Sequence, residues 1–300
     1  MLSACGEDPY PPPGPQGRDL SHYLEAPSPL RLVEVMAGKS NRERGAVLIA
    51  VLNTHLIPFK AEPYEESGVS GRNLVVRTGN RKKNRFVILA HYDRRPETPG
   101  ANDNASCVAA VLEAARGVLK SVPLQHIAVD FVFSDGEESG LRGARAFAAA
   151  HGTETLAGAA SFEMCGIGNA FGIWDVTGKA KGSRIVRALQ GAGAQRKIYN
   201  GTHGAVPRFG SDHRQFSRLG VPAVGVTILP REDETTLRDY VDHPNSLKWL
   251  FPFLRPTIFR TYHTADDRAD TIDAAAIAMT ARILTTAIVI FDKLAGEEET

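Results

Sequence analysis

The sequence contains little cysteine and almost no excess charge of either sign. Its three cysteines, Cys5, Cys107 and Cys165, are too few for the disulfide framework of a small secreted domain. Lysine and arginine total 35 against 34 aspartates and glutamates, so no broad basic surface for nucleic acid or anionic lipid is expected. The apolar stretch Ile277–Ile290 is interrupted by threonine and arginine. It is therefore predicted to be a docked terminal helix and not a membrane span.

Material for a hydrophobic core is plentiful. Of the 300 residues, 43% are hydrophobic, and strand-like segments alternate with helix-like segments along the chain. This pattern predicts a single α/β domain with a mixed, mostly parallel central β-sheet and helices on both faces. We expect the folded domain to occupy residues 29–300, and the proline-rich residues 1–28 to form a tether or tail.

The amino terminus has two readings. Leu2–Cys5 fits a bacterial lipobox, and the following GEDPYPPPGPQG would serve as an extended tether from a lipidated cysteine. No charged or strongly apolar leader segment precedes the lipobox in this sequence. Either the true start lies upstream and the signal has been removed, or the lipobox match is chance. The tether favours an exported protein whose start lies upstream, periplasmic or lipid-anchored through Cys5, over a cytoplasmic one.

Two adjacent glutamates follow an apolar segment. The run FVFSDGEESG is a strand that breaks after Phe133 and presents Glu137 and Glu138 at its carboxyl end. Adjacent carboxylates at the end of a buried strand repel each other and are costly to desolvate. The pairing is explained if a divalent cation binds one glutamate and a proton passes through the other. A lone Glu-Glu pair is weak evidence, because most such pairs lie on solvated loops or helix starts.

Other candidate ligands also follow predicted strands. Arg85–Ala90 is an apolar strand that leads directly into His91. Asp93 has the spacing to accept a hydrogen bond from the second ring nitrogen of His91, which would fix the tautomer for metal binding. Asp103 lies on the loop that opens an alanine-rich helix. In open α/β sheets, ligands bind beyond the carboxyl ends of the strands.

Two further segments complete the set. Glu163 follows a short apolar run, and Tyr262 and His263 come just before the last long helix. The candidate metal ligands are therefore His91, Asp103, Glu138, Glu163 and His263. Imidazole and carboxylate groups without a thiolate suit a hydrolytic pair of zinc ions, with cobalt or manganese as substitutes. Taken singly, each residue has a plainer explanation as a satisfied core histidine, a helix cap or a surface acid.

Five segments, in their order and spacing, resemble the M28 family of zinc metallopeptidases. They are AHYDRRPETPGANDNASCVAAVLEAAR, DFVFSDGEESGLRGARAFA, FEMCG, GSDHRQFSRLGVPAVGV and YHTADD. The resemblance covers residues 40–292, nearly the whole chain. It implies the zinc exopeptidase fold, which is also called phosphorylase/hydrolase-like, and a peptide as the substrate.

The resemblance also implies a role for each candidate ligand. The residue matching Asp103 bridges two zinc ions in that family. Those matching His91 and Glu163 bind one of the two ions. Those matching Glu138 and His263 bind the other. The peptide bond between Asp103 and the next residue is expected to be cis.

Two further residues carry the expected chemistry. The resemblance implies that Glu137 is the general base and that Tyr262 helps to hold the oxyanion. The expected reaction is that of an aminopeptidase, in which a water held between the two metals loses its proton to Glu137 and attacks the amino-terminal peptide bond. Asp212 and His213 of the GSDHRQF segment, together with Asp93 and Asp267, are expected to support the ligands or the pocket wall, and Asp267 could buttress His263.

The chain departs from the family pattern at two positions. Glu163 stands where aminopeptidases of the family usually have aspartate, so its extra methylene must shift the carboxylate or the backbone. Cys107 replaces a glycine that is common after the Asn-Ala-Ser turn. It is expected to pack in the core and not to bind metal.

The substrate is less readable than the metal site. Residues 229–261 form an insert whose aromatic residues, Trp249, Phe251 and Phe253 among them, are expected to line an apolar pocket as a lid. Equally, they could cover the sheet edge or a subunit contact, and the oligomeric state is open. Arg208 could instead bind a terminal carboxylate, which would indicate a carboxypeptidase or dipeptidase.

Two other classes share the expected scaffold. Glutaminyl cyclases use one zinc ion to close an amino-terminal glutamine, and their WHT-like ending is echoed in YHTADD. Tyr262 in place of tryptophan, and the NDNAS loop, are closer to the two-metal peptidases. A noncatalytic scaffold on the same fold ranks last, because such relatives lose ligands or the base and here the set is complete.

Overall fold

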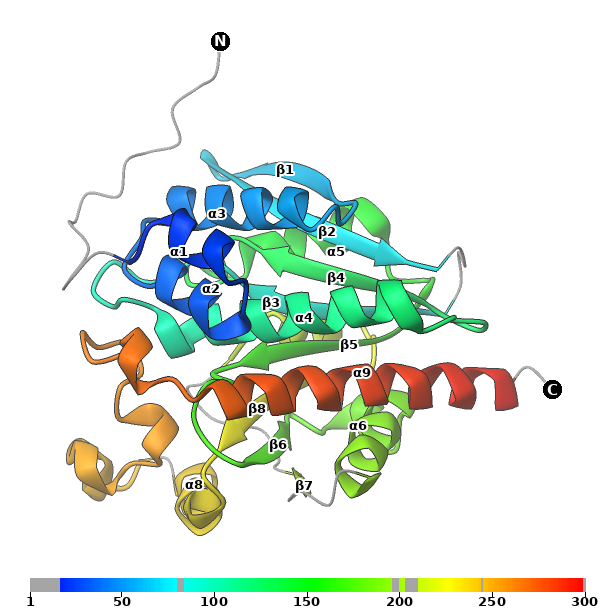
Figure 1. The fold of residues 1–300 in the computed structure, drawn as a ribbon. Coiled ribbons are helices and arrows are strands. Elements are labelled where there is room, and N and C mark those ends of the chain that lie inside the picture. Colours follow the sequence, from blue (N-terminus) through cyan, green and yellow to red (C-terminus); the bar gives the residue numbers. More distant parts are fainter. Residues whose placement is uncertain (1–16, 80–83, 196–199, 203–209, 244, 299–300) are drawn as a thin grey trace.

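The computed structural model describes residues 17–79, 84–195, 200–202, 210–243 and 245–298 (Figure 1). Within them, eight strands form one sheet. Their bounds are β1 Lys60–Glu66, β2 Val69–Thr78, β3 Arg85–His91, β4 Ala128–Ser134, β5 Leu156–Glu163, β6 Ala170–Trp174, β7 Asn200–Thr202 and β8 Ala223–Leu229. Across the sheet they are ordered β1-β2-β4-β3-β5-β8-β6-β7.

The centre of the sheet is parallel and its margins are mixed. Strands β4, β3, β5 and β8 run parallel to one another. On one side β2 pairs antiparallel with β4, and β1 pairs antiparallel with β2. On the other side β6 is antiparallel to β8, and β7 is parallel to β6. The predicted mixed, mostly parallel sheet is confirmed, and the carboxyl ends of its central strands share one edge.

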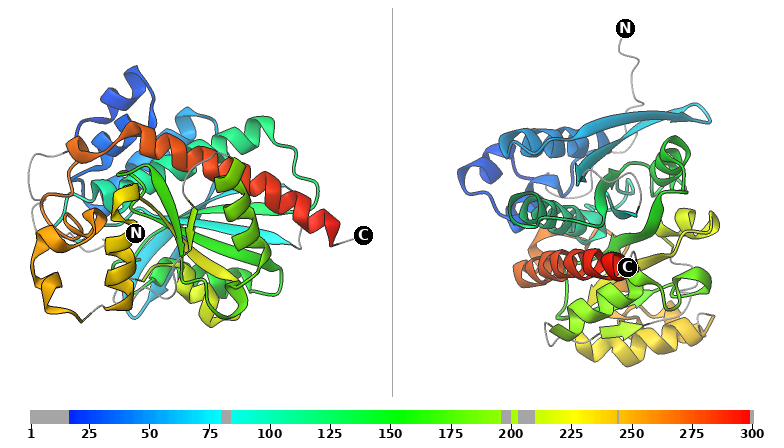
Figure 2. Two further views of the ribbon diagram at one scale, coloured as in Figure 1. Left: turned by 90° about the horizontal axis from the view of Figure 1, so that it is seen from below. Right: turned by 90° about the vertical axis from the view of Figure 1, so that its right-hand side faces the viewer.

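Helices cover both faces of the sheet (Figures 1 and 2). Their bounds are α1 Leu20–Glu25, α2 Pro29–Met36, α3 Asn41–Thr54, α4 Ser106–Ser121, α5 Arg142–His151, α6 Arg184–Gln195, α7 His213–Arg218, α8 Glu234–Asp242 and α9 Ala274–Glu297. Successive side chains of a strand point to opposite faces. Thus Phe86 of β3 stacks on Phe291 of α9, whereas Val87 packs in the other core with Phe147 of α5 and Phe216 of α7.

The folded chain begins earlier than expected. Tyr23 of α1 is buried in the main core, and its hydroxyl lies 2.6 Å from Nε2 of His55, just after α3. The boundary expected at residue 28 is therefore too late, because α1 already packs on the domain. Ser40 caps α3: its side chain accepts a hydrogen bond from the backbone amide of Glu43, and the side chain of Glu43 accepts one from the backbone amide of Ser40. Cys5 lies outside the described residues.

The carboxyl-terminal helix α9 lies across one face of the sheet (Figure 2). By length and composition alone it could cross a membrane. Half of its most apolar part is buried inside the fold, and α9 packs on α4 and α6. Burial of this kind is what a core helix of a globular domain shows, which agrees with the predicted docked terminal helix.

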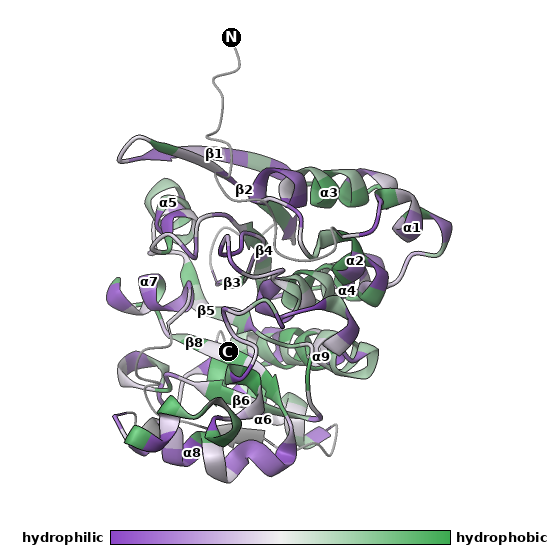
Figure 3. Ribbon diagram, turned by 90° about the vertical axis from the view of Figure 1, so that its left-hand side faces the viewer, coloured by the Kyte–Doolittle hydropathy of each residue, from purple (hydrophilic) through white to green (hydrophobic). Residues whose placement is uncertain are grey.

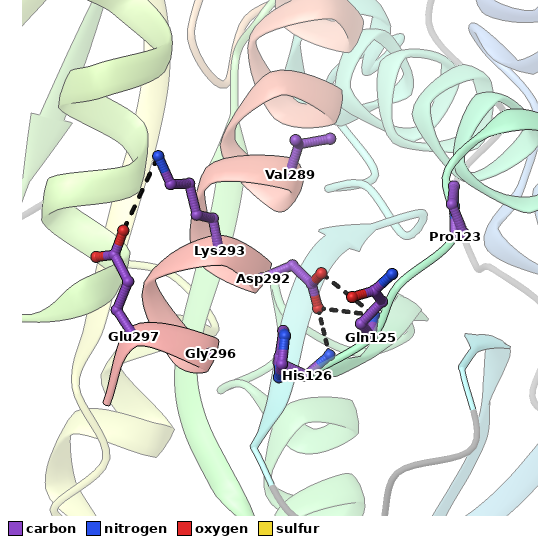
Figure 4. A pocket seen from close by; sticks show the side chains of 8 residues that line it. All are labelled: Pro123, Gln125, His126, Val289, Asp292, Lys293, Gly296 and Glu297. Carbon is purple, nitrogen blue, oxygen red and sulfur yellow. Dashed lines mark hydrogen bonds and ion pairs between the residues drawn. The ribbon is translucent and has the colours of Figure 1, made fainter. Parts of the chain in front are cut away.

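A shallow hollow of about 480 Å³ lies where the end of α9 meets the segment before β4 (Figure 4). The carboxylate of Asp292 accepts hydrogen bonds from the backbone amides of Gln125, His126 and Ile127 there. This contact fastens α9 to the amino-terminal end of β4. The hollow is therefore at the opposite edge of the sheet from the predicted metal ligands.

Candidate metal centre

One carboxylate lies between two histidines at the carboxyl edge of the sheet, the side seen in Figure 3. Oδ1 of Asp103 is 3.2 Å from Nε2 of His91, and its Oδ2 is 3.3 Å from Nε2 of His263. Oε2 of Glu163 lies 3.3 Å from the same nitrogen of His91. Oε2 of Glu138 lies 3.3 Å from that of His263. The five predicted ligands therefore form two groups that share Asp103.

The spacing within each group fits a metal ion. Ligand atoms bound tetrahedrally to zinc at about 2.0 to 2.1 Å are separated by about 3.3 to 3.4 Å along each edge of the tetrahedron. The imidazole–carboxylate distances of 3.2 and 3.3 Å agree with this edge length. Three buried polar atoms in the second group lack a hydrogen-bond partner within the described chain: Oδ2 of Asp103, Oε1 of Glu138 and Nε2 of His263. Buried polar atoms without a partner, in residues whose ligand atoms lie together, are what a cation site requires.

The electrostatics also favour a cation. Burial, reinforced by the charge of Asp103, raises the pKa of Glu138 to about 7. Burial alone would lower the pKa of His263, but its contacts with Asp103 and Glu138 raise it to about 9. The metal-free cluster therefore has to hold protons to compensate its crowded carboxylates. A divalent cation would take over that compensation.

Asp93 holds the two adjacent glutamates in place. Its carboxylate accepts hydrogen bonds from the backbone amides of Glu137 and Glu138, both at 3.1 Å. The Nδ1–H of His91 is directed to the backbone carbonyl of Asp93 at 3.1 Å, with the Asp93 carboxylate at 3.3 Å. The expected contact between His91 and Asp93 is thus present, although the nearer acceptor is the carbonyl. This leaves Nε2 of His91 facing Asp103 and Glu163.

The loop Ala101–Ala105 ties two ligand segments together. The peptide bond between Asp103 and Asn104 is cis, as the resemblance implied. The Asn104 amide donates to the carbonyl of Phe162 at 2.8 Å and accepts from the amide of Met164 at 3.2 Å, so it grips the backbone on both sides of Glu163. Met164 itself has a left-handed backbone, with φ of 49°. Sequence reasoning missed this role of Asn104, although the polar NDNAS run was a signal.

Asp267 supports a different ligand from the one predicted. Its two carboxylate oxygens accept hydrogen bonds from the backbone amides of Asn102 and Asp103, at 2.6 and 3.1 Å. Because both oxygens face these amides, Asp267 orients the bridging aspartate and not His263. The buried guanidinium of Arg44, also unpredicted, donates to the carbonyl of Gly100 at 3.0 Å and lies close enough to Asp103 and Asp267 to interact with their charges.

The structure also accounts for the two departures from the family pattern. The hydroxyl of Ser211 donates to Oε1 of Glu163, which leaves Oε2 for the group around His91. Ser211 is buried and was not predicted from the sequence. The longer glutamate side chain is thus held at both oxygens. Cys107 is buried in the main core, as expected.

Asp212 and His213 lie behind the site. The buried Asp212 accepts a hydrogen bond from the Ser134 hydroxyl at 2.5 Å, and burial raises its pKa to about 7. His213 contacts Ser161 through Nδ1 at 2.7 Å and Asp175 through Nε2 at 3.0 Å. These contacts anchor the start of α7 and, with it, the neighbouring Ser211.

An aromatic row connects the insert to the site. Tyr262 stacks on His263 and contacts Phe259, which contacts Tyr240. Tyr240 in turn contacts Trp249. Trp249 is thus buried, with 7% exposure, against another aromatic residue of the insert.

The remaining pocket predictions are not decided by these contacts. Phe251 and Phe253 are 54% and 68% exposed, and their rings contact each other. Their role in a substrate pocket stays a prediction. Arg208 lies outside the described residues.

A model of peptidase family M28 matches residues 73–288. The chain belongs to peptidase family M28. The match extends from β2 into α9 and includes all five predicted ligands, Glu137 and Tyr262. The resemblance stated from the five sequence segments is therefore confirmed at the level of the family.

Relatives of this M28 chain match it over short segments. Over 92 residues it is 39% identical to the probable lipoprotein aminopeptidase LpqL of Mycobacterium tuberculosis, which covers 30% of this chain and 18% of that protein. Among the curated relatives, the matched segments span 9 to 18% of each relative's own length.

Solved structures resemble the M28 chain over most of its length. A Porphyromonas gingivalis glutaminyl cyclase has a TM-score of 0.66 at 19% identity, with 89% of this chain and 97% of that chain covered. A Zn-dependent exopeptidase from Parabacteroides distasonis has a TM-score of 0.65 at 18% identity, with 91% and 98% covered. At these identities the likeness concerns the fold, and it confirms the predicted fold class.

Proposed function

We propose that the chain is a two-zinc exopeptidase, most specifically an aminopeptidase that hydrolyses the amino-terminal peptide bond of its substrate. The observation that carries the proposal is the position of Asp103, whose two oxygens face His91 and His263 separately. A carboxylate in this position can serve two ions at once. Membership of peptidase family M28 supports the same reading.

Each ion would have its own ligands besides the shared aspartate. His91 and Glu163 would hold the first, and Glu138 and His263 the second. Bound zinc supplies Lewis-acid polarisation of a carbonyl and lowers the pKa of water. Cobalt or manganese could replace it, because the ligands are nitrogen and oxygen only.

Glu137 would act as the general base. Burial, with the nearby carboxylates of Glu163 and Asp212, raises its pKa well above the ordinary glutamate value in the metal-free protein. A carboxylate with a raised pKa is a stronger base and can take a proton from the attacking water. It can then deliver that proton to the leaving amine. The backbone amide of Glu137 donates a hydrogen bond to Asp93, which fixes the position of the Glu137 backbone.

Tyr262 would supply a hydrogen-bond donor to the developing oxyanion. Burial, with the charges of Asp103 and Glu138, raises the pKa of its phenol far above the ordinary value. The phenol therefore stays protonated at neutral pH and remains able to donate. Its ring position is fixed by the contact with His263.

The name of the M. tuberculosis relative, a probable lipoprotein aminopeptidase, supports export as a further part of the proposal. It agrees with the lipobox-like Leu2–Cys5. Anchoring through Cys5 would keep the peptidase domain at a membrane surface. Radiolabelled palmitate should then enter the wild-type chain, and should not enter Cys5→Ala, when each is expressed with a bacterial leader.

The activity is tested with zinc-loaded protein and a panel of dipeptides and aminoacyl anilides, each with a free and an acetylated amino terminus. The proposal predicts cleavage of the free forms alone. Glu137→Gln should keep its fold and bound zinc while turnover falls by about 10²- to 10⁴-fold. Glu113→Gln, which alters a half-buried glutamate on α4 that is paired with Arg116, serves as the matched control.

Other outcomes would identify the rival functions. Cleavage of acetylated dipeptides would indicate a carboxypeptidase or dipeptidase. Cyclisation of glutaminyl peptides without any hydrolysis would indicate a glutaminyl cyclase, which the shared fold allows. Folded, zinc-loaded protein that is inactive in all of these assays would favour a noncatalytic scaffold.

A further inference from the structure

The two halves of the candidate centre differ in access. His91, Asp103 and Glu163 are buried. In the other group the side chains of Glu138 and His263 are 10% and 24% exposed. A substrate therefore approaches from the side of Glu138 and His263, and residues that border this side are the first to meet it.

An ion pair borders that open side. Arg95 and Glu97 lie on the loop between β3 and Asp103, with side chains 43% and 50% exposed, and Nε of Arg95 is 2.7 Å from Oε1 of Glu97. The hydrogen bond to Glu97 raises the pKa of Arg95, and the charges of Glu97 and Glu138 contribute to the rise. Glu97 in turn interacts electrostatically with His263. Both side chains are thus within electrostatic reach of the second ligand group.

The loop that carries this pair is held in place by a buried arginine. The buried Arg94 donates through Nη1 to the carbonyls of Arg95, Pro96 and Thr98 at 2.7 to 3.0 Å. Its Nε donates to the carbonyl of Lys39 at 2.8 Å. One guanidinium therefore ties together the carbonyls on both sides of Glu97. A preorganised loop lowers the entropic cost of using its side chains for binding.

Arg95 has hydrogen-bond donors that Glu97 does not use. Among the described residues, Glu97 is its side-chain partner and engages Nε, while the two Nη groups have no hydrogen-bond partner. A guanidinium offers its donors in a planar fork that matches a carboxylate. Glu97 is flexible enough to yield, because it is half exposed and its contact with Arg95 is a surface ion pair of small net stability.

We propose that Arg95 recognises a carboxylate group on the peptide substrate at the open side of the centre, and that Glu97 competes with this carboxylate for the guanidinium. The inference rests on the proposed peptidase function and names its preferred substrates. They are peptides with an acidic side chain next to the scissile bond, or dipeptides whose own terminal carboxylate lies within reach.

Matched pairs of peptides distinguish a side-chain carboxylate from the terminal carboxylate of a dipeptide. Ala-Ala is compared with Ala-Ala-amide for the terminal carboxylate. Ala-Asp-amide is compared with Ala-Asn-amide, and Asp-Ala-amide with Asn-Ala-amide, for the side chains on either side of the bond. The measured quantity is the ratio of kcat/KM for the charged peptide to that for its neutral partner. Affinities of the same pairs for zinc-loaded Glu137→Gln, measured by calorimetry, give a readout that does not depend on turnover.

The proposal predicts a ratio of about tenfold or more for at least one pair in the wild-type chain, the size expected of a charge-assisted hydrogen bond. Arg95→Ala should bring that ratio close to one, and Arg95→Lys should restore part of it. Glu97→Gln should increase the ratio, because the competitor is gone. Arg116→Ala, which removes the arginine of an ion pair on α4, should keep the wild-type ratio.

Three results would overturn the inference. Wild-type ratios near one for all pairs, with ready hydrolysis, would refute Arg95 as the recognition residue and leave the peptidase proposal intact. A fall in kcat/KM for every free-amino peptide in Glu97→Gln, with unchanged ratios, would show that Glu97 binds the substrate ammonium instead. No hydrolysis and no binding of any peptide by zinc-loaded protein would refute the peptidase function itself, and this inference with it.

Discussion

The ring of Tyr262 stacks on that of His263, with 3.7 Å between their centroids and 25° between their planes. His263 has a left-handed backbone, with φ of 57°, which a residue other than glycine seldom adopts. The stack and the backbone together fix the direction of the imidazole. A residue proposed to stabilise the oxyanion therefore also orients a proposed metal ligand.

Substitution of Tyr262 separates these two roles. Tyr262→Phe keeps the ring and removes the hydroxyl, so kcat should fall by about 10²-fold, as for the loss of one oxyanion donor, while zinc affinity is retained. Tyr262→Ala also removes the stack, and zinc affinity should then fall by about tenfold. Steady-state kinetics and zinc titration of both variants measure the two effects. Equal kcat for wild type and Tyr262→Phe would exclude the donor role.

Shortening Glu163 tests whether its length is matched to Ser211. In Glu163→Asp the carboxylate can no longer reach both the Ser211 hydroxyl and the group around His91, so zinc affinity should fall by about 10- to 100-fold. Ser211→Ala should lower affinity less, since it removes one hydrogen bond. In the double variant the two effects should fall short of their sum, because the residues share one interaction. Full additivity in zinc titrations would show that they act independently.

The lowered pKa of Asp175 makes the stability of the folded protein depend on pH in acid. Burial raises its pKa, but hydrogen bonds from His213 and Arg214 outweigh burial and lower it to about 2. Because the folded pKa lies below the ordinary value, the stabilisation is fully present above about pH 4 and is lost as pH falls toward about 2, amounting to about 2 kcal/mol.

Denaturant unfolding across this pH range measures the effect. Asp175→Asn should be less stable than wild type at pH 5 and should lose less of its stability between about pH 4 and about pH 2. Asp270→Asn, in an exposed ion pair with Arg268, is the control and should follow the wild-type profile. Parallel profiles for Asp175→Asn and wild type would contradict the assignment.

Sequence reasoning could place the candidate ligands at one edge of the sheet because they follow the strands. Runs of apolar residues identify β3, β4 and β5, and a ligand or base comes at or just after the end of each, so their convergence follows from the parallel sheet. The contacts that hold the ligands could not be predicted in the same way. Asn104 and Ser211 act through partners that are distant in sequence, and no periodic pattern reports such contacts.

The same dependence on contacts that are distant in sequence explains why the partner of Asp267 was predicted wrongly. Asp267 is close in sequence to His263 and was expected to support it, yet the turn after Thr264 directs its carboxylate to the amides of Asn102 and Asp103. Trp249 was expected to line a pocket, and the structure packs its indole on Tyr240 of the same insert with 7% exposure. In both cases the choice among nearby partners depends on three-dimensional packing.

If two metal ions share Asp103, the zinc content of the folded protein will show it. After zinc loading and removal of free metal, the wild-type chain should hold two ions per chain. His263→Ala should hold close to one, and Asp103→Ala close to none, with circular dichroism confirming that each variant is folded. One ion per wild-type chain, or an Asp103→Ala variant that binds as much zinc as wild type, would contradict the shared carboxylate.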